Sequence, residues 1–600
     1  MRKLLTSLYV ALVCFSSAFA KNDGLVKELT IRGPTDIAVA TDARMALTIN
    51  ELSRSVSLVD LISGTVIHEQ LLPSAPATIV SFPQNRFAVS CPEAAKVMVY
   101  EIQAQTLHQM AEIELEFEPS GLAIDYERRS LYVSLMASGE VMSINLDTRQ
   151  PQFRTFVGLW PRYITLSPDG SKLVAGLSGE SQIAVMDAGS GEVLYSEPLS
   201  GGINLGHMQC SQDGSYVYFP WMVYRSNPIT VANIRRGWVL ASRIGRVRLD
   251  GPSYREAISL DVPRLAVADP HGLILTPDQK RLAVSSSGTH ELLVYRMADL
   301  PFVGAGGPGD LIDEKLLLDQ DLFYRLELGG RPLGLRSWGD GRFVLVANQL
   351  RDSVQIVDIH ERKIDREIFL GKLSQDEFEQ QVQRGREIFF DARRSLDQWY
   401  SCHSCHQYGG TNAKAMDTWN DGSELTSKTV IPLENVAQTG PWTWHGWQDD
   451  LDASLRNSFT STMQGEKPTE TDVAALKAFL AQLRSKSNPF AQSEKQAEAA
   501  ARGKSIFESQ QAGCAECHSG PLFTDGKIHD VGLGAQSDRY EGYNTPSLIG
   551  VFRKPRLLHD GRAKTLEAVL GRWHRAEEIG GGSELSEKQL QDLIAYLQSL

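Results

Sequence analysis

The sequence predicts a multidomain protein in which an all-β, seven-bladed propeller precedes two mainly α-helical domains. Three observations carry this prediction. Residues 21–370 repeat a phrase of short apolar strands and polar turns, a C-x-x-C-H run occurs twice in the last third of the chain, and the segments around the two runs match one another. The fold class is therefore read from repeats rather than from overall composition.

The repeat of residues 21–370 combines about four short strands with turns such as Ser167–Gly170. One strand, of I-x-V-x-D type, recurs in seven copies, whose last residues are Asp60, Glu101, Asn145, Asp187, Arg248, Arg296 and Asp358. Apolar alternation with turn residues at each boundary indicates antiparallel strands. A period near ~42 residues with four strands per unit is typical of a β-propeller. The repeats resemble the YVTN-type bacterial propellers, which implies a rigid platform.

The first residues predict a cleaved signal peptide spanning residues 1–20. A basic start is followed by the apolar run Leu4–Phe15 and by the A-x-A sequence Ala18–Ala20. That run is too short to cross a bilayer, and no later segment is long and apolar enough, so we expect no transmembrane segment. The mature chain is expected to begin near Lys21 in the periplasm.

The two C-x-x-C-H runs predict cofactor attachment. Two cysteines three residues apart can form thioether bonds to the two vinyl groups of one haem, and the adjacent histidine then reaches the iron. A single run could instead be a zinc site or a redox dithiol, but a zinc ribbon needs a second C-x-x-C in a short span. The sequence therefore predicts two covalently bound haem c groups, held by Cys402, Cys405, Cys514 and Cys517, with His406 and His518 as proximal ligands.

The net charge argues against some classes of binding partner, and most of the cysteines are accounted for by the haem runs. The formal net charge of −13 argues against nucleic acid or an anionic membrane as a partner and would attract a basic electron carrier. Four of the seven cysteines lie in the haem runs, and Cys14 lies in the signal peptide. Cys91 and Cys210 lie in different repeats, so a disulfide between them stays open, and two buried free thiols are the preferred interpretation.

The C-terminal third contains two copies of one sequence module. A helix, a C-x-x-C-H run, a long irregular segment and a closing helix make one cytochrome c fold. The pattern Ser374-x-x-Glu377 predicts the start of the first helix. Gly446 and Leu451 of the first copy match Gly561 and Leu566 of the second. We therefore expect cytochrome c domains at residues 371–486 and 487–600, after the propeller at 21–370.

These motifs carry a family resemblance. Gly385-x-x-Ile388-Phe389-Phe390-Asp391 before the first haem run, and Asn544–Leu548 and Leu558–Arg562 after the second, resemble the bacterial di-haem cytochrome c peroxidase and MauG superfamily. The resemblance implies that one haem reacts with hydrogen peroxide while the other passes electrons. It also implies an ordered tryptophan between the haems, with Trp419, Trp442, Trp444 and Trp447 as candidates.

The resemblance also implies where sixth ligands should be sought. For the second haem, the family ligand follows the His-Asp-Gly motif, where this chain has His574; bis-histidine ligation would give a lower potential than histidine and methionine. For the first haem, Met463 occupies the comparable region. Alternatively, His574 is a surface histidine and Met463 is a methionine that packs on the haem without binding its iron.

The sequence departs from the family at several positions. The glutamine and glutamate expected over the peroxide-binding haem align near Ser454 and Thr462, so His445 is named as the substitute acid-base residue. His559 and Asp560 are expected to hold the fold or support other residues. Calcium between the haems is a further cofactor of the family, although its binding residues do not map cleanly onto this chain.

The sequence therefore predicts a periplasmic di-haem peroxidase-type oxidoreductase. It would reduce hydrogen peroxide with electrons from a small cytochrome or copper protein, or oxidise a protein substrate in the manner of MauG. The alternative is a non-enzymatic electron-transfer cytochrome whose propeller is a docking platform. A displaceable ligand on one iron distinguishes the two functions.

Overall fold

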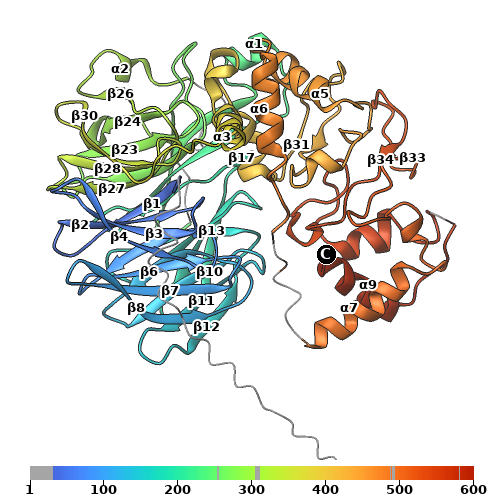
Figure 1. The fold of residues 1–600 in the computed structure, drawn as a ribbon, viewed down its shortest axis with the longest axis horizontal. Helices are drawn as coiled ribbons and strands as arrows, with labels where there is room; N and C mark the ends of the chain where they lie inside the picture. The colour runs from blue at the N-terminus through green and yellow to red at the C-terminus, as the bar shows by residue number, and fades with distance from the viewer. Residues whose placement is uncertain (1–30, 253–255, 305–310, 487, 489–493, 580) are drawn as a thin grey trace, which may run out of the picture.

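The computed structural model describes residues 31–252, 256–304, 311–486, 488, 494–579 and 581–600 (Figure 1). The predicted signal peptide lies outside these residues. Within them, no helix has the length and apolar character needed to cross a bilayer. A β-propeller forms the N-terminal part of the molecule, and a mainly helical region lies against one side of it (Figure 1).

The first four blades are regular four-stranded antiparallel sheets in which sequence neighbours pair. Their strands are β1–β4 (Pro34–Val39, Met45–Asn50, Ser55–Asp60, Thr65–Leu71), β5–β8 (Ile79–Phe82, Arg86–Cys91, Lys96–Gln103, Thr106–Glu114), β9–β12 (Pro119–Asp125, Ser130–Leu135, Glu140–Asn145, Pro151–Phe156) and β13–β16 (Pro161–Leu166, Lys172–Leu177, Gln182–Asp187, Val193–Pro198).

The fifth blade is enlarged, and the sixth and seventh return to four strands. The fifth contains β17 (Gly202–Ile203), β18 (Gln209–Cys210), β19 (Tyr216–Tyr224), β20 (Leu240–Arg248), β21 (Glu256–Ser259) and β25 (Val303–Gly304), with α1 (Val231–Arg235) between β19 and β20. The sixth is β22–β24 with β26 (Pro270–Leu275, Arg281–Ser286, Glu291–Arg296, Phe323–Glu327), and α2 (Glu314–Leu317) lies between β24 and β26. The seventh is β27–β30 (Pro332–Trp338, Phe343–Asn348, Ser353–Asp358, Lys363–Phe369).

Seven blades confirm the predicted fold class. All but one of the seven predicted strand ends coincide with strand ends in the structure, and β7 runs past Glu101 to Gln103.

The Cys91 and Cys210 thiols are free and buried in separate apolar clusters, which confirms the preferred interpretation of these cysteines.

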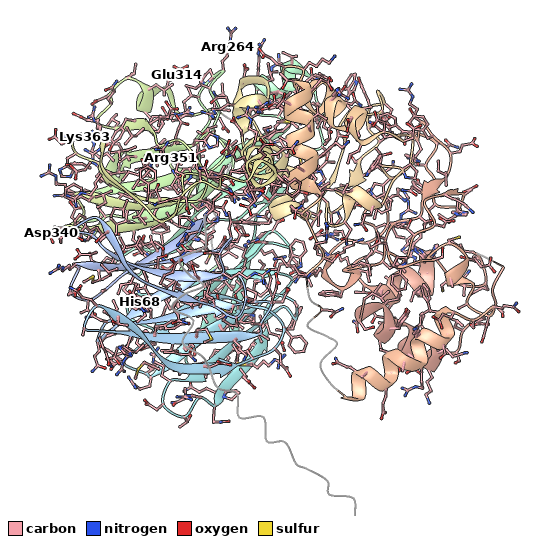
Figure 2. The ribbon with its side chains drawn as sticks, in the orientation of Figure 1. His68, Arg264, Glu314, Asp340, Arg351 and Lys363 are labelled. Atoms are coloured by element: carbon pink, nitrogen blue, oxygen red, sulfur yellow. The ribbon has the colours of Figure 1, made fainter. Side chains whose placement is uncertain are left out.

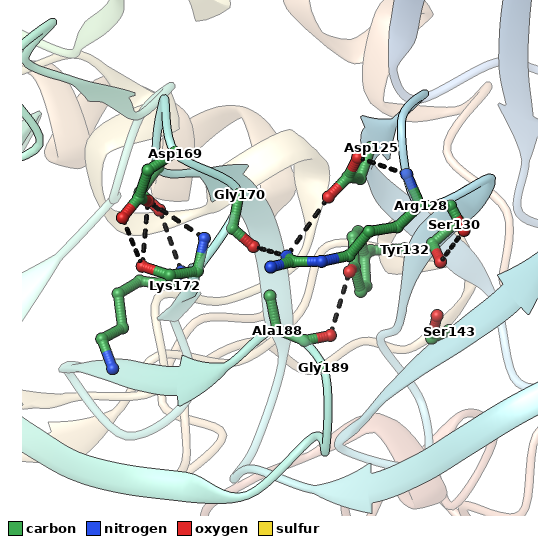
Figure 3. Close-up of polar contacts among 12 residues, drawn as sticks. Asp125, Arg128, Ser130, Tyr132, Ser143, Asp169, Gly170, Lys172, Ala188 and Gly189 are labelled. Carbon is green, nitrogen blue, oxygen red and sulfur yellow. Dashed lines mark hydrogen bonds and ion pairs between the residues drawn. The ribbon is translucent and has the colours of Figure 1, made fainter.

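Polar contacts join neighbouring blades around the ring. In Figure 3 the Tyr132 hydroxyl of the third blade donates to the Ala188 carbonyl oxygen of the fourth at 2.9 Å, and the Arg128 side chain reaches the Gly170 carbonyl oxygen. The ring closes where the backbone N–H groups of Arg32 and Gly33 donate to Asp352 Oδ1 at 2.9 and 2.8 Å. The first strand is thus tied to the last blade, which is what a propeller needs because each blade packs only on its neighbours.

Charged side chains gather on the outer margin of the propeller. Glu314, Asp340 and Lys363 are exposed there (Figure 2). The apolar side chains lie between blades in successive buried clusters. The propeller therefore has the polar exterior and blade-to-blade core that its alternating sequence pattern predicts.

The C-terminal region repeats one helical arrangement twice. Its elements are α3 (Glu377–Phe389), α4 (Cys402–Cys405), α5 (Leu451–Asn457), α6 (Glu470–Leu480), α7 (Glu494–Phe507), α8 (Leu566–Ala568) and α9 (Glu587–Gln598), with short strand pairs β31–β32 (Ala415–Met416, Lys428–Thr429) and β33–β34 (Ile528–His529, Tyr543–Asn544). α3 begins at Glu377 rather than at the predicted Ser374, because the Asp376 side chain accepts from the Glu379 N–H and caps the helix.

In each module the first and last helices, α3 with α6 and α7 with α9, cross closely at a glycine. A Cβ at Gly385 of α3 would lie 2.0 Å from the Ala475 carbonyl oxygen of α6, and a Cβ at Gly503 of α7 would lie 1.9 Å from the Asp592 carbonyl oxygen of α9. No side chain fits at such a distance, so glycine is required at both positions. The shared crossing supports the predicted duplication.

The propeller holds the first C-x-x-C-H run directly. Asp269, which is 3% exposed, accepts hydrogen bonds from the hydroxyls of Ser401 and Ser404 at 2.6 and 2.7 Å. Asn204 donates to the Ser404 carbonyl oxygen at 2.9 Å. Burial raises the pKa of Asp269, while the two serine hydroxyls and the charge of Arg331 oppose that rise. The first run is therefore fixed by a buried carboxylate from another part of the chain.

His207 and His271 lie in the same interface. Their ring centroids are 4.7 Å apart, and His271 Nε2 lies 3.0 Å from the Tyr163 hydroxyl and 3.1 Å from the Tyr408 hydroxyl. Tyr408 follows the first haem run, so this cluster also packs the propeller against it.

The change Asp269→Ala should destabilise the haem-loaded protein. It leaves two buried serine hydroxyls without an acceptor, and we expect a loss of about 2–3 kcal/mol in the free energy of unfolding. The measurement is the urea midpoint followed by haem absorbance. The matched control Asp365→Ala, at an exposed strand position, should change this free energy by less than about 0.5 kcal/mol. Equal midpoints for the two variants would contradict the structural role of Asp269.

Candidate functional site

Two apolar cavities lie in the C-terminal region, and each contains one C-x-x-C-H run. The first cavity, of about 350 Å³, contains Cys402, Cys405 and His406. The second cavity, of about 220 Å³, contains Cys514, Cys517 and His518. Their apolar walls and paired thiols fit a covalently attached, largely hydrophobic macrocycle. The structure therefore brings all six predicted attachment and proximal residues to cavity walls.

The first run is formed as a short helix. α4 starts after Ser401, whose N–H donates to Ser404 Oγ at 3.0 Å, and the adjacent His406 follows at its end. Burial lowers the pKa of His406 to about 4, which keeps its imidazole neutral at physiological pH. A neutral imidazole is the form that binds a metal ion.

The second run has a defined imidazole orientation. His518 Nδ1 lies 3.1 Å from the Phe523 carbonyl oxygen, so Nδ1–H donates and Nε2 is free to bind. His574 faces it, with ring centroids 6.5 Å apart and planes at 79°. An imidazole nitrogen binds a metal ion at about 2.0 Å, so two imidazoles on opposite faces of one ion have ring centres roughly 6.4 Å apart. Burial lowers the pKa of His574 to about 4, so this ring is also neutral.

A π-helical turn precedes Met463 in the first module and His574 in the second. α5 continues into a π turn at Ser458–Thr462, after which Met463 donates its N–H to the Ser458 carbonyl oxygen at 2.8 Å. α8 continues into a π turn at Val569–Trp573, after which His574 donates to Val569 at 2.8 Å. Single π turns are frequent at functional sites because they re-aim the next side chain. Met463, 3% exposed and in the first cavity wall, is thus the structural counterpart of His574.

Among the four candidate tryptophans, Trp444 is the one that lines both cavities. Its Nε1–H donates to the Thr429 carbonyl oxygen at 2.7 Å, which fixes the indole. Trp442 and Trp447 line the first cavity only. The sequence alone could not choose among these tryptophans, because the place of each one relative to the two cavities depends on how the two modules face each other.

His445 also lines the first cavity and is 5% exposed. Its Nδ1 lies 2.7 Å from the Gly542 carbonyl oxygen, so Nδ1–H donates and Nε2 can accept a proton. Ser454 and Thr462 line the same cavity with neutral hydroxyls. His559 is 4% exposed, and burial lowers its pKa to about 4; its backbone carbonyl accepts from the Thr429 N–H.

Two residues of the first cavity wall were missed by the sequence reasoning. Glu434 is a carboxyl whose pKa is raised by burial, and buried Met416 accepts a hydrogen bond at its sulfur from Asn412 Nδ2 at 3.3 Å. A glutamate in an irregular segment and a methionine in a two-residue strand carry no periodic signal. Only the tertiary fold brings them to the cavity.

Comparison with known proteins agrees with these features. The family model described as di-haem cytochrome c peroxidase matches residues 379–506. The gamma subunit of hydrazine synthase from Kuenenia stuttgartiensis is 27% identical over 272 residues, covering 36% of this chain and 77% of that protein. The methylamine utilization protein MauG of Methylorubrum extorquens is 28% identical over 283 residues, covering 37% and 78%.

A further relative is the cytochrome c551 peroxidase of Pseudomonas aeruginosa, 22% identical over 279 residues, which cover 37% of this chain and 79% of that protein. The resemblance found in the motifs is thereby confirmed for the C-terminal part of the chain. The C-terminal region is thus similar to di-haem cytochrome c peroxidases and to MauG, and it follows a seven-bladed β-propeller in the chain.

Proposed function

We propose that this protein is a periplasmic peroxidase-type enzyme in which hydrogen peroxide reacts in the first cavity and electrons enter through the second. The donor is a small redox protein; oxidation of a protein substrate is the other use of the same chemistry. When bound, the haems would supply one-electron transfer and, at an accessible iron face, peroxide reduction. The observation that supports this division is the difference between His574 and Met463 at equivalent positions.

The second cavity is suited to electron transfer alone. His518 and His574 are half-buried and both neutral, and their spacing would allow both to hold one iron, which would leave no site for peroxide. In the first cavity, the opposing side chain is a thioether, which is a weaker ligand than imidazole. Met463 would give way to a small molecule more readily than His574. A carrier with two closed irons is the rival function.

Near the first cavity, His445 is assigned the proton transfer that peroxide cleavage requires. The Gly542 carbonyl holds Nδ1–H, so Nε2 is the atom that accepts a proton from one peroxide oxygen and returns it to the other. Trp444, which lines both cavities, is assigned the path of electrons between them.

The change His574→Ala should remove the axial ligand of the second haem. We expect the bis-histidine low-spin EPR signal of the ferric protein to disappear while two haems per chain are retained, because Cys514 and Cys517 still attach the group. The control His529→Ala removes a partly exposed histidine that pairs with Asp525 and should leave the spectrum unchanged. An unchanged spectrum in His574→Ala would show that the ligand lies elsewhere.

Replacing Met463 tests where peroxide reacts, and with it the proposed function. Met463→His should close the first site with a stronger ligand and slow the peroxide reaction at least tenfold, measured by stopped-flow absorbance. Met463→Leu conserves volume and should react at least as fast as the wild type. The enzyme proposal fails if the wild-type protein does not react with peroxide, which is the result expected for the carrier.

Removing the base should slow turnover without blocking peroxide entry. We expect His445→Gln to lower the rate of peroxide reduction by roughly 10²-fold, the usual contribution of a positioned acid-base group. Glu466→Gln, at an exposed position after the π turn of the same module, is the control and should keep the wild-type rate. A wild-type rate in His445→Gln would refute this role and favour Glu434 in its place.

A further inference from the structure

Tyr543, on β34, lies at the centre of an aromatic stack between the two cavities. Its ring centroid is 4.7 Å from that of His445, with planes at 26°, and 4.2 Å from that of His559, with planes at 19°. His445 lines the first cavity, whereas Tyr543 and His559 line the second. The phenol ring therefore lies in the wall that separates the cavities.

The hydroxyl of Tyr543 has a fixed proton acceptor. It donates to Asp538 Oδ2 at 2.7 Å and lies 3.2 Å from His559 Nε2. Lys428 Nζ holds the other carboxylate oxygen of Asp538 at 2.6 Å. Burial raises the pKa of Tyr543, so the phenol keeps its proton at neutral pH until it is oxidised.

These contacts give Tyr543 a property that Trp444 lacks. A phenol loses an electron readily only when its proton leaves at the same time, because the oxidised phenol is a far stronger acid than the phenol itself. Asp538 is a carboxylate, and it can receive that proton over a short hydrogen bond. The indole N–H of Trp444 donates to the Thr429 carbonyl oxygen, which is not a base at neutral pH.

We propose that Tyr543 is a redox-active tyrosine that supplies one of the two electrons consumed by hydrogen peroxide. The inference rests on the proposed peroxide reaction. Reduction of one peroxide to two waters takes two electrons and two protons. One electron passes from the phenol to the haem site that peroxide has oxidised, the O–H bond of Tyr543 breaks, and its proton moves to Asp538 Oδ2. An electron from the donor protein and the returning proton restore the phenol.

The test uses the full-length, haem-loaded ferric protein mixed with one equivalent of hydrogen peroxide and freeze-quenched for EPR. The wild type should give a tyrosyl radical, identified because its hyperfine structure narrows when the protein contains ring-deuterated tyrosine. Tyr543→Phe should still react with peroxide by absorbance while its radical falls at least tenfold. Asp538→Asn keeps the size of the acceptor but removes its basicity, and should also lower the radical yield.

The control is Tyr540→Phe, which removes a tyrosine that stacks on Trp447 with centroids 5.7 Å apart and should retain the signal. A tyrosyl signal that persists in Tyr543→Phe, or a wild-type peroxide reaction that yields no tyrosyl radical, would refute the role of Tyr543. Neither result would refute the proposed peroxide reaction. A wild-type protein whose absorbance does not respond to peroxide would refute the proposed function, and the role of Tyr543 with it.

Discussion

The structure depends on one repeated constraint, which is that a π-helical turn in each C-terminal module places the following side chain, Met463 or His574, in the wall of a cavity that contains a C-x-x-C-H run. The two modules share this turn, the helix crossing at a glycine and the C-x-x-C-H run. Because the backbone is repeated, the chemistry of the two sites can differ through one side chain. His574 lies opposite His518 with ring centroids 6.5 Å apart, whereas Met463 occupies the equivalent position beside the first cavity.

The propeller contributes to the first haem site rather than serving as a separate appendage. Asp269 and Asn204 hold the backbone and hydroxyls of the first C-x-x-C-H run, and the His271 imidazole contacts Tyr408 just beyond it. A buried carboxylate bonded to two hydroxyls ties that run to one orientation, since breaking the contact would leave several polar groups without partners. The site proposed for peroxide is therefore the one the propeller supports. The resemblance of the repeats to YVTN-type propellers implies a rigid platform only.

Much of this fold could be predicted because local sequence patterns determine its elements. Strand ends such as Asp187 and Asp358 follow from period-two alternation, and haem attachment follows from residues three and four apart. The features that could not be predicted depend on contacts between distant segments. The choice of Trp444, the half-buried Glu434 and the stack around Tyr543 all require both modules to be in place. α3 begins at Glu377 because Asp376, rather than Ser374, caps it.

EPR of the ferric wild-type protein measures directly whether the two proposed haem sites differ in their ligands. Two distinct signals of equal weight are expected. One should be a low-spin bis-histidine signal. The other should be either a high-spin signal or the low-spin signal of histidine and methionine, and it alone should change when a small ligand such as cyanide is added. Two equivalent bis-histidine signals that are both insensitive to cyanide would contradict the account.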